Sequence, residues 1–158
     1  MLEGGNLLTL RLPFPISANN YWQIVGKRLI KTKKARLFIT EVVVAWLEAK
    51  ASGCKPFNEE DDLALAVAVH YPVKKGPDTD LDNLCKVLID AMETAQIFPN
   101  DKQFRHIQLT REPFTDKKGG VRVVIQKCKK EMDLHDGTFT VKGIHRSNIR
   151  WDNKINGT

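Results

Sequence analysis

Three aspartates at alternate positions, Asp78, Asp80 and Asp82, are the residues of this 158-residue sequence that most directly suggest chemistry. They stand in the segment GPDTDLDNLCKVLIDAMETA, residues 76–95, and run directly into an apolar helical pattern. Carboxylates so close together repel one another, so a positive charge is expected among them. Hard carboxylate oxygens suit Mg²⁺, which keeps several waters and commonly binds beside phosphates. The segment therefore indicates a metal site that acts on a phosphate substrate.

Two structural explanations compete with a metal site. An EF-hand loop starting at Asp78 would need Gly and Glu at its sixth and twelfth positions, which hold Asn83 and Ile89, so this reading is rejected. Helix capping is the second explanation, because acids near a helix N-terminus complement its dipole, and Thr79 with Asp82 loosely matches a capping box. Capping explains one or two acids but gives no reason for three, and it stays open as an alternative.

The helix that follows has a charged face. At about 100° per residue, Asp82, Lys86 and Asp90 fall within about 80° of one another. The apolar residues form a separate stripe: Leu84, Val87, Leu88 and Ala91. Lys86 would either form a surface ion pair or steady the charge that develops on a phosphate.

A fourth acid, Asp101, stands in the turn FPNDKQ just after this helix. From there the chain could return toward the helix start or toward a neighbouring sheet end. In the first case Asp101 would join the carboxylate cluster.

The element pattern predicts an α+β fold in βαβαββ order, with a mixed sheet of about four strands packed with two main helices. The elements are a strand at 7–12, an irregular loop at 13–21, a helix at 35–51, a buried strand at 63–71, the aspartate-motif helix, and strands at 104–112 and 121–128. The last two strands are expected to form a hairpin, because the connector PFTDKKGG ends in two glycines. One face of the first helix carries Leu37, Thr40, Val43, Val44 and Leu47.

The sequence indicates one domain over residues 1–130 and a polar tail or appendage of unassigned role over 131–158. Three well-separated cysteines without a C-x-x-C pair favour neither disulfides nor zinc. No apolar run reaches the roughly 20 residues that span a bilayer. We expect a cytoplasmic protein without a membrane partner.

A net charge of +6 favours polyanionic partners, with nucleic acid first and an anionic membrane second. Cationic runs are often only solvated surface, but these flank the aspartates, so we expect phosphate contacts. The candidates are Lys27, Arg28, Lys31, Lys33, Lys34, Lys74 and Lys75. Tyr21 and Trp22 would either stack on an exposed base or close their loop onto the core.

The motif DTDLDNLCKVLIDAM followed by FPNDKQ resembles the RusA family of Holliday-junction resolvases. The family signature is D-L-D-N-x-x-K, then D-A, then an acidic turn ending in D-x-Q. The segment LPFPISANNYW is also similar to the family's P-x-P-x-S-x-N, and the resemblance spans about residues 7–127. The chain differs at Asn100, where members often have another acid, and in its tail.

The resemblance implies that Asp80, Asp82 and Asp101 bind Mg²⁺, with Mn²⁺ as a substitute, and that Lys86 joins them as a catalytic residue. Asp90 and Asn83 would lie behind these residues and support them without binding the ion, and Asp90 could be only structural.

The implied activity is paired symmetric nicking of a four-way junction by a homodimer, leaving 5′-phosphate and 3′-hydroxyl ends, in recombination and repair. No nucleotide cofactor is implied, and a phage or prophage origin fits the family. The alternatives are a non-catalytic basic DNA-binding module and a nuclease of the same chemistry that acts on flaps or forks.

Overall fold

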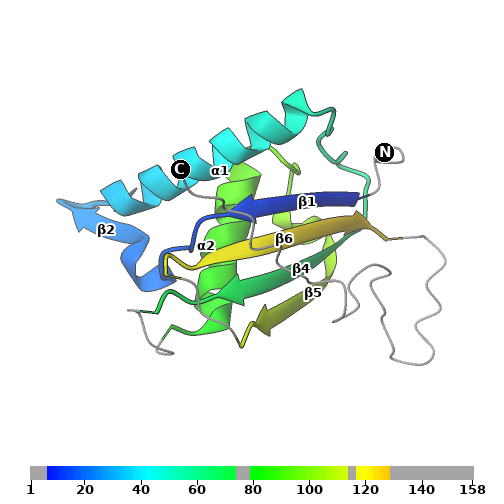
Figure 1. Ribbon diagram of the computed structural model, residues 1–158. Coiled ribbons are helices and arrows are strands. Elements are labelled where there is room, and N and C mark those ends of the chain that lie inside the picture. The colour runs from blue at the N-terminus through cyan, green and yellow to red at the C-terminus, as the bar shows by residue number, and fades with distance from the viewer. Residues whose placement is uncertain (1–6, 74–78, 114–116, 129–158) are drawn as a thin grey trace.

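A four-stranded sheet and two helices make up the body of the molecule, and a small two-stranded hairpin extends from it (Figure 1). The computed structural model describes residues 7–73, 79–113 and 117–128. The elements are β1 (Leu7–Leu12), η1 (Ala18–Asn20), β2 (Trp22–Val25), β3 (Arg28–Lys31), α1 (Lys33–Ala51), β4 (Leu63–His70), α2 (Leu81–Thr94), η2 (Asp101–Gln103), β5 (Phe104–Arg111) and β6 (Gly120–Lys127). This confirms the α+β class, the mixed four-stranded sheet and the two main helices.

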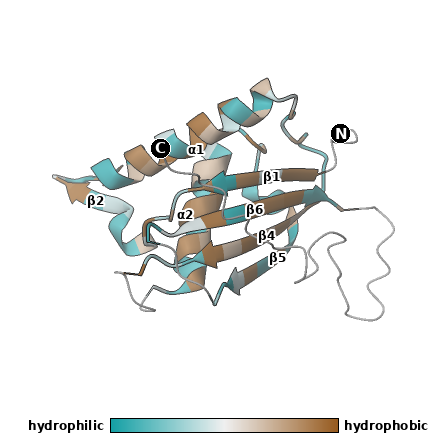
Figure 2. Cartoon of the chain, in the orientation of Figure 1, coloured by the Kyte–Doolittle hydropathy of each residue, from teal (hydrophilic) through white to brown (hydrophobic). Residues whose placement is uncertain are grey.

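The strand order in the sheet is β1-β6-β4-β5. β4 pairs in parallel with β5 and antiparallel with β6, and β6 also pairs antiparallel with β1. All eight residues of β4 are buried, as the continuous apolar run predicted for an interior strand. Figure 2 shows the hydrophobic residues gathered on the central strands and on α2.

The expected hairpin between the last two strands is wrong, because β4 lies between β5 and β6. The connector instead brings Gly119 against the end of β4. A Cβ at this residue, whose φ is +68°, would lie 2.7 Å from Cδ of Pro72 and 2.8 Å from the carbonyl oxygen of His70. The glycine therefore serves close backbone packing in a conformation that L side chains rarely adopt.

The helix α1 has two apolar faces, of which only one meets the core. The buried residues are Ala35, Phe38, Val42 and Trp46. The stripe noted in the sequence lies on the opposite side, where Leu37, Val44 and Leu47 are about half exposed or more. The apolar periodicity of the sequence correctly predicted the helix, but the stripe it picked out is the exposed face and not the core face.

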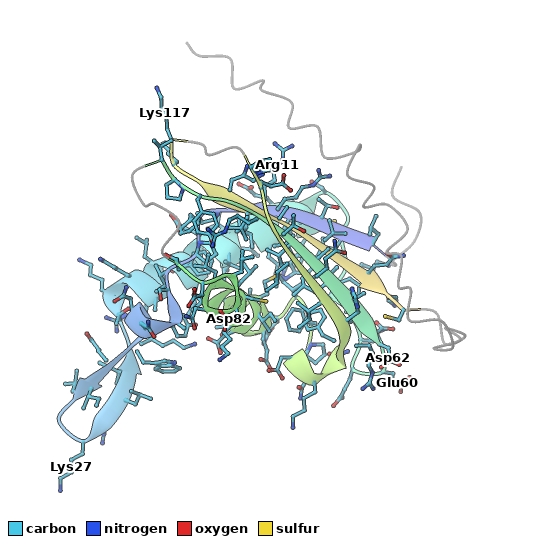
Figure 3. The ribbon with its side chains drawn as sticks, turned by 90° about the horizontal axis from the view of Figure 1, so that it is seen from below. Arg11, Lys27, Glu60, Asp62, Asp82 and Lys117 are labelled. Carbon is cyan, nitrogen blue, oxygen red and sulfur yellow. The ribbon has the colours of Figure 1, made fainter. Side chains whose placement is uncertain are left out.

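The β2–β3 hairpin, residues 22–31, was not predicted. Its strands have four residues each, and none of the residues in β2 is buried, so no core-facing alternation identifies them. Gly26, with φ of +62°, lies in the turn, and the hydroxyl of Thr32 caps α1 by accepting from the N–H of Ala35 at 3.1 Å. Figure 3 shows Lys27 at the tip of the hairpin, away from the body.

Within the described part of the chain, no helix is long and apolar enough to cross a membrane. The predicted tail at 131–158 lies outside the described residues.

Candidate active site

Asp80 and Asp82 lie where the chain enters α2, after the carboxyl end of β4. Asp80 is the N-cap residue, but its side chain makes no capping hydrogen bond. Asp82 lies in the first turn, and both residues are exposed. The capping explanation therefore does not account for the carboxylate of Asp80, and Thr79 is not the N-cap. Asp78 lies outside the described residues.

The backbone before Asp80 is held by two side chains from neighbouring strand ends. The hydroxyl of Tyr71 donates to the carbonyl oxygen of Thr79 at 2.7 Å. Nη2 of Arg111 donates to the same oxygen at 3.4 Å and to the Tyr71 hydroxyl at 3.3 Å, while its guanidinium lies 4.4 Å from the centre of the Tyr71 ring. These contacts fix the approach to Asp80.

Sequence reasoning missed Tyr71 and Arg111. The parallel pairing of β4 with β5 brings the two side chains to the same edge of the sheet. The sequence pattern did not indicate this pairing, so it offered no signal for either residue. Tyr71 is buried, which raises its pKa; the charge of Arg111 opposes this rise, and the nearby charge of Asp80 adds to it. A positive group thus lies beside the start of α2, next to the acids.

Lys86 lies one turn beyond Asp82 on the exposed face of α2, as predicted. It forms no salt bridge with any residue in the described ranges, so those residues do not support the surface ion pair as its role. It lines an open hollow of about 350 Å³ between α2 and the base of the hairpin. The lining residues are Ala18, Tyr21, Trp22, Lys86, Val87, Ile89, Asp90, Glu93 and Asp101. Such a hollow leaves the ammonium open to an anionic substrate.

Asp90 ties the hairpin to α2. It accepts a short hydrogen bond from the hydroxyl of Tyr21, and Nζ of Lys31 lies 3.1 Å from the same carboxylate oxygen. Burial raises the pKa of Tyr21 well above its usual value, and the hydrogen bond and charge of Asp90 raise it further. These contacts support a structural role for Asp90.

Only one of the two candidate stacking rings is accessible. Tyr21 is 3% exposed and packs in the core, which matches the alternative in which it closes the loop. Trp22 is 44% exposed, and the two rings meet edge to face at 5.4 Å between their centres. Of the two rings, Trp22 is therefore the one exposed enough to stack on a base.

Asp101 lies at the other end of α2. The turn that carries it is closed by a capping box between Asn100 and Gln103, and Nε2 of Gln103 donates to the carbonyl oxygens of Asn58 and Asp61. Asn100, the residue that differs from the family pattern, thus closes the turn that carries Asp101. The two anchors of the turn, Asn58 and Asp61, precede β4, whereas the start of α2 follows the end of β4.

Asp101 lies beside Glu93, which belongs to the last turn of α2. The pKa of Glu93 is raised by burial and then by the charges of Asp101 and Asp90, while the backbone N–H of Asp101 opposes the rise by hydrogen bonding. At about 1.5 Å per residue, α2 separates Asp82 from Glu93 by about 16 Å along its axis. Within one chain, the structure therefore does not bring Asp101 together with Asp80 and Asp82.

The remaining pair, Asp80 and Asp82, offers two exposed carboxylates to a divalent cation. Among the described residues there is no group of three or more His, Cys, Asp or Glu side chains placed to hold a metal ion. Mg²⁺ is, however, commonly held by one or two carboxylates together with substrate phosphate and water. Asp80 and Asp82 meet that need, with the half-buried Asn83 beside them in the first turn of α2.

The described cationic candidates lie on the hairpin and at the start of α1. Lys27 is in the hairpin turn, Arg28 and Lys31 are in β3, and Lys33 and Lys34 begin α1. Lys31 is engaged with Asp90, whereas Lys27 extends into solvent (Figure 3). The pair at positions 74 and 75 lies outside the described residues.

One comparison with known proteins found a match that covers most of the described chain. The family model described as endodeoxyribonuclease RusA matches residues 13–126, which cover both ends of α2 and the whole hollow. A search of curated proteins found no match.

Proposed function

The chain belongs to the RusA family of endodeoxyribonucleases, and on that premise we propose that it resolves four-way DNA junctions by Mg²⁺-dependent hydrolysis. The products are paired symmetric nicks with 5′-phosphate and 3′-hydroxyl ends, made in the cytoplasm during recombination or repair. Water is the attacking group, so no nucleotide cofactor takes part.

One observation carries the proposal: the carboxylate of Asp80 makes no capping bond although it occupies the N-cap, and it stands beside Asp82 and one turn before Lys86. Leaving an N-cap carboxylate out of the cap forgoes about 1 kcal/mol of helix stabilisation. A metal-binding role explains that arrangement, whereas a purely structural role does not.

The residues divide the chemistry among them. Asp80 and Asp82 would hold Mg²⁺, or Mn²⁺ in its place, which would supply Lewis acidity for hydrolysis of the phosphodiester. Lys86 faces the hollow, where its charge stabilises a phosphate that gains negative charge in the transition state. For Asp101 to share the same ion, it must come from a second copy of the chain, which is consistent with a homodimer.

A second copy also has a surface to meet. Leu37, Val44 and Leu47 form an exposed apolar stripe on α1, opposite the core face. A junction with two-fold symmetry needs two active sites, and a two-fold dimer supplies them. We therefore place the dimer contact on this stripe.

The test is incision of a labelled four-way junction, compared with a flap, a fork and a linear duplex that share its sequence. Each substrate is incubated with Mg²⁺, with Mn²⁺ and with EDTA. We expect opposed nicks in the junction with either ion and none with EDTA. Preferential cutting of the flap or fork would show that this structure, and not the four-way junction, is the substrate. Tight junction binding without incision under any ion would show that the protein is a non-catalytic binding module.

A further inference from the structure

The β2–β3 hairpin carries apolar side chains that are exposed and do not pack into the hydrophobic core. Ile24 and Leu29 are directly opposite each other across the two strands, and Trp22 lies two residues before Ile24 on the same face. Their exposed fractions are 77%, 62% and 44% in that order. Exposed apolar residues gathered on one face of a projecting element indicate a contact surface.

The base of this hairpin is firmly held. The N–H of Thr32 donates to the carbonyl oxygen of Tyr21 at 3.0 Å, and its hydroxyl donates to that of Asn20 at 2.8 Å. Asp90 on α2 binds both Tyr21 and Lys31, and the Lys31 ammonium lies 5.5 Å from the centre of the Trp22 ring. The apolar face is thus presented at a defined place.

That place adjoins the candidate active site. Trp22 lines the same hollow as Lys86 and Asp101, so the apolar face of the hairpin begins at the rim of the hollow and continues along the strands to Ile24 and Leu29. Whatever covers Ile24 and Leu29 therefore lies next to whatever enters the hollow.

Charge decides between the possible occupants. From position 4 to position 40 the sequence has no acidic residue, whereas it has seven cationic ones: Arg11, Lys27, Arg28, Lys31, Lys33, Lys34 and Arg36. The same hairpin from a second copy would bring like charges together, while DNA offers phosphates to the cations. DNA-bending proteins insert apolar side chains between base pairs in this way, with cations on the flanking phosphates.

We infer that the β2–β3 hairpin is a wedge that enters the branch point of a DNA junction. Ile24 and Leu29 contact the base faces that are open where the arms part, and Lys27 and Arg28 contact the adjoining phosphates. A continuous duplex has no such opening without unstacking, so the wedge favours branched over linear DNA. The inference rests on the proposed function and adds the element that recognises the branch.

The test uses an immobile four-way junction with 2-aminopurine at the branch point, and a second junction with the probe inside one arm. Binding is followed with Ca²⁺ in place of Mg²⁺ to prevent incision. The variant Ile24→Thr with Leu29→Thr keeps strand propensity while removing apolar surface. Val25→Thr is the matched control, because Val25 is 54% exposed on the opposite face of the same hairpin.

We expect wild type and the Val25 control to raise the branch-point fluorescence severalfold on saturation, with little change from the arm probe. The double variant should lose at least half of that rise and about tenfold in preference for junction over duplex, with unchanged circular dichroism.

An undiminished rise in the double variant, beside a wild type that binds and cuts junctions, would overturn the wedge alone. A change of oligomeric state in the double variant would assign the face to a second copy and also overturn it. A wild type that binds no junction would overturn both the wedge and the proposed function.

Discussion

Asp90 is the side chain through which α2, the loop before β2 and strand β3 meet. Its carboxylate accepts from Tyr21 and pairs with Lys31, and it also lines the hollow together with Glu93 and Asp101. Asp90 shares the exposed side of α2 with Lys86, but its contacts with Tyr21 and Lys31 hold the base of the hairpin against α2. The charged face of α2 thus combines an anchoring residue with candidate catalytic ones.

Replacing Tyr21 by Phe tests the anchor through its pH dependence. The pKa of Tyr21 is raised in the folded protein, so its contribution to stability is present below the usual tyrosine pKa of about 10 and is lost as the pH rises above it. We expect Tyr21→Phe to lower the free energy of unfolding by about 1–2 kcal/mol at pH 7.5, with a deficit that shrinks above pH of about 10.

Urea unfolding of both proteins at several pH values measures this difference. The raised pKa values of Tyr71 and Cys85 act equally in both proteins and cancel in the comparison. A deficit that stayed constant up to pH of about 11 would contradict the raised pKa of Tyr21, which burial and Asp90 together cause.

Strand β4 and helix α2 show how far the sequence determines the elements. The continuous apolar run of β4 and the single apolar stripe of α2 are local patterns, and both elements were predicted within a few residues. The charged face with Asp82, Lys86 and Asp90 followed from the same periodicity. The family signature added the expected roles, which the periodicity alone does not give.

Pairing order and the site's long-range geometry could not be predicted in the same way. β6 enters between β1 and β4, and the connector that permits this depends on the fit of Gly119 against Pro72, a contact remote in sequence. The position of Asp101 depends on Gln103 reaching the backbone of Asn58 and Asp61. The sequence pattern did not predict the hairpin, because its strands are short and none of the residues in β2 is buried.

The end of β4 positions the start of α2, because the hydroxyl of Tyr71 holds the backbone just before Asp80. We expect Tyr71→Phe to remove the bond to the carbonyl of Thr79, and so to loosen Asp80 without touching the substrate. Incision should then need about fivefold more Mg²⁺ for half-maximal rate, with a smaller change in the rate at saturating Mg²⁺. Phe keeps the ring packed against Phe14 and Arg111.

A titration of incision rate against Mg²⁺ concentration, run beside Thr110→Ser on the neighbouring strand as a control, separates this role from general destabilisation. An unchanged Mg²⁺ requirement with a uniformly lower rate would indicate that Tyr71 contributes only to packing.

Among the described residues, exposed apolar side chains gather on the hairpin and on α1. We assign the first to DNA and the second to another copy of the chain, because the hairpin surface is surrounded by cations and adjoins the hollow. If so, Leu47→Glu, which keeps good helix propensity, should convert the dimer to a monomer.

Sedimentation velocity at micromolar concentration measures this change, with Ile107→Glu as a control for an exposed apolar residue away from α1. We expect the Leu47 variant to sediment as a monomer with an unchanged far-ultraviolet spectrum, and the control to remain dimeric. A Leu47 variant that stays dimeric would place the contact elsewhere.

The most direct test of the account is single-turnover incision of a prebound four-way junction on addition of Mg²⁺, comparing Asp82→Asn with Glu60→Gln. Both changes remove one exposed negative charge, but Glu60 lies before β4 and Asp82 after it, on different sides of the molecule (Figure 3). We predict that Asp82→Asn binds the junction as well as wild type and cuts it at least 1,000-fold more slowly, on the order of what loss of a metal ligand costs, while Glu60→Gln cuts normally. Incision by Asp82→Asn at the wild-type rate would contradict a catalytic role for the acids at the start of α2.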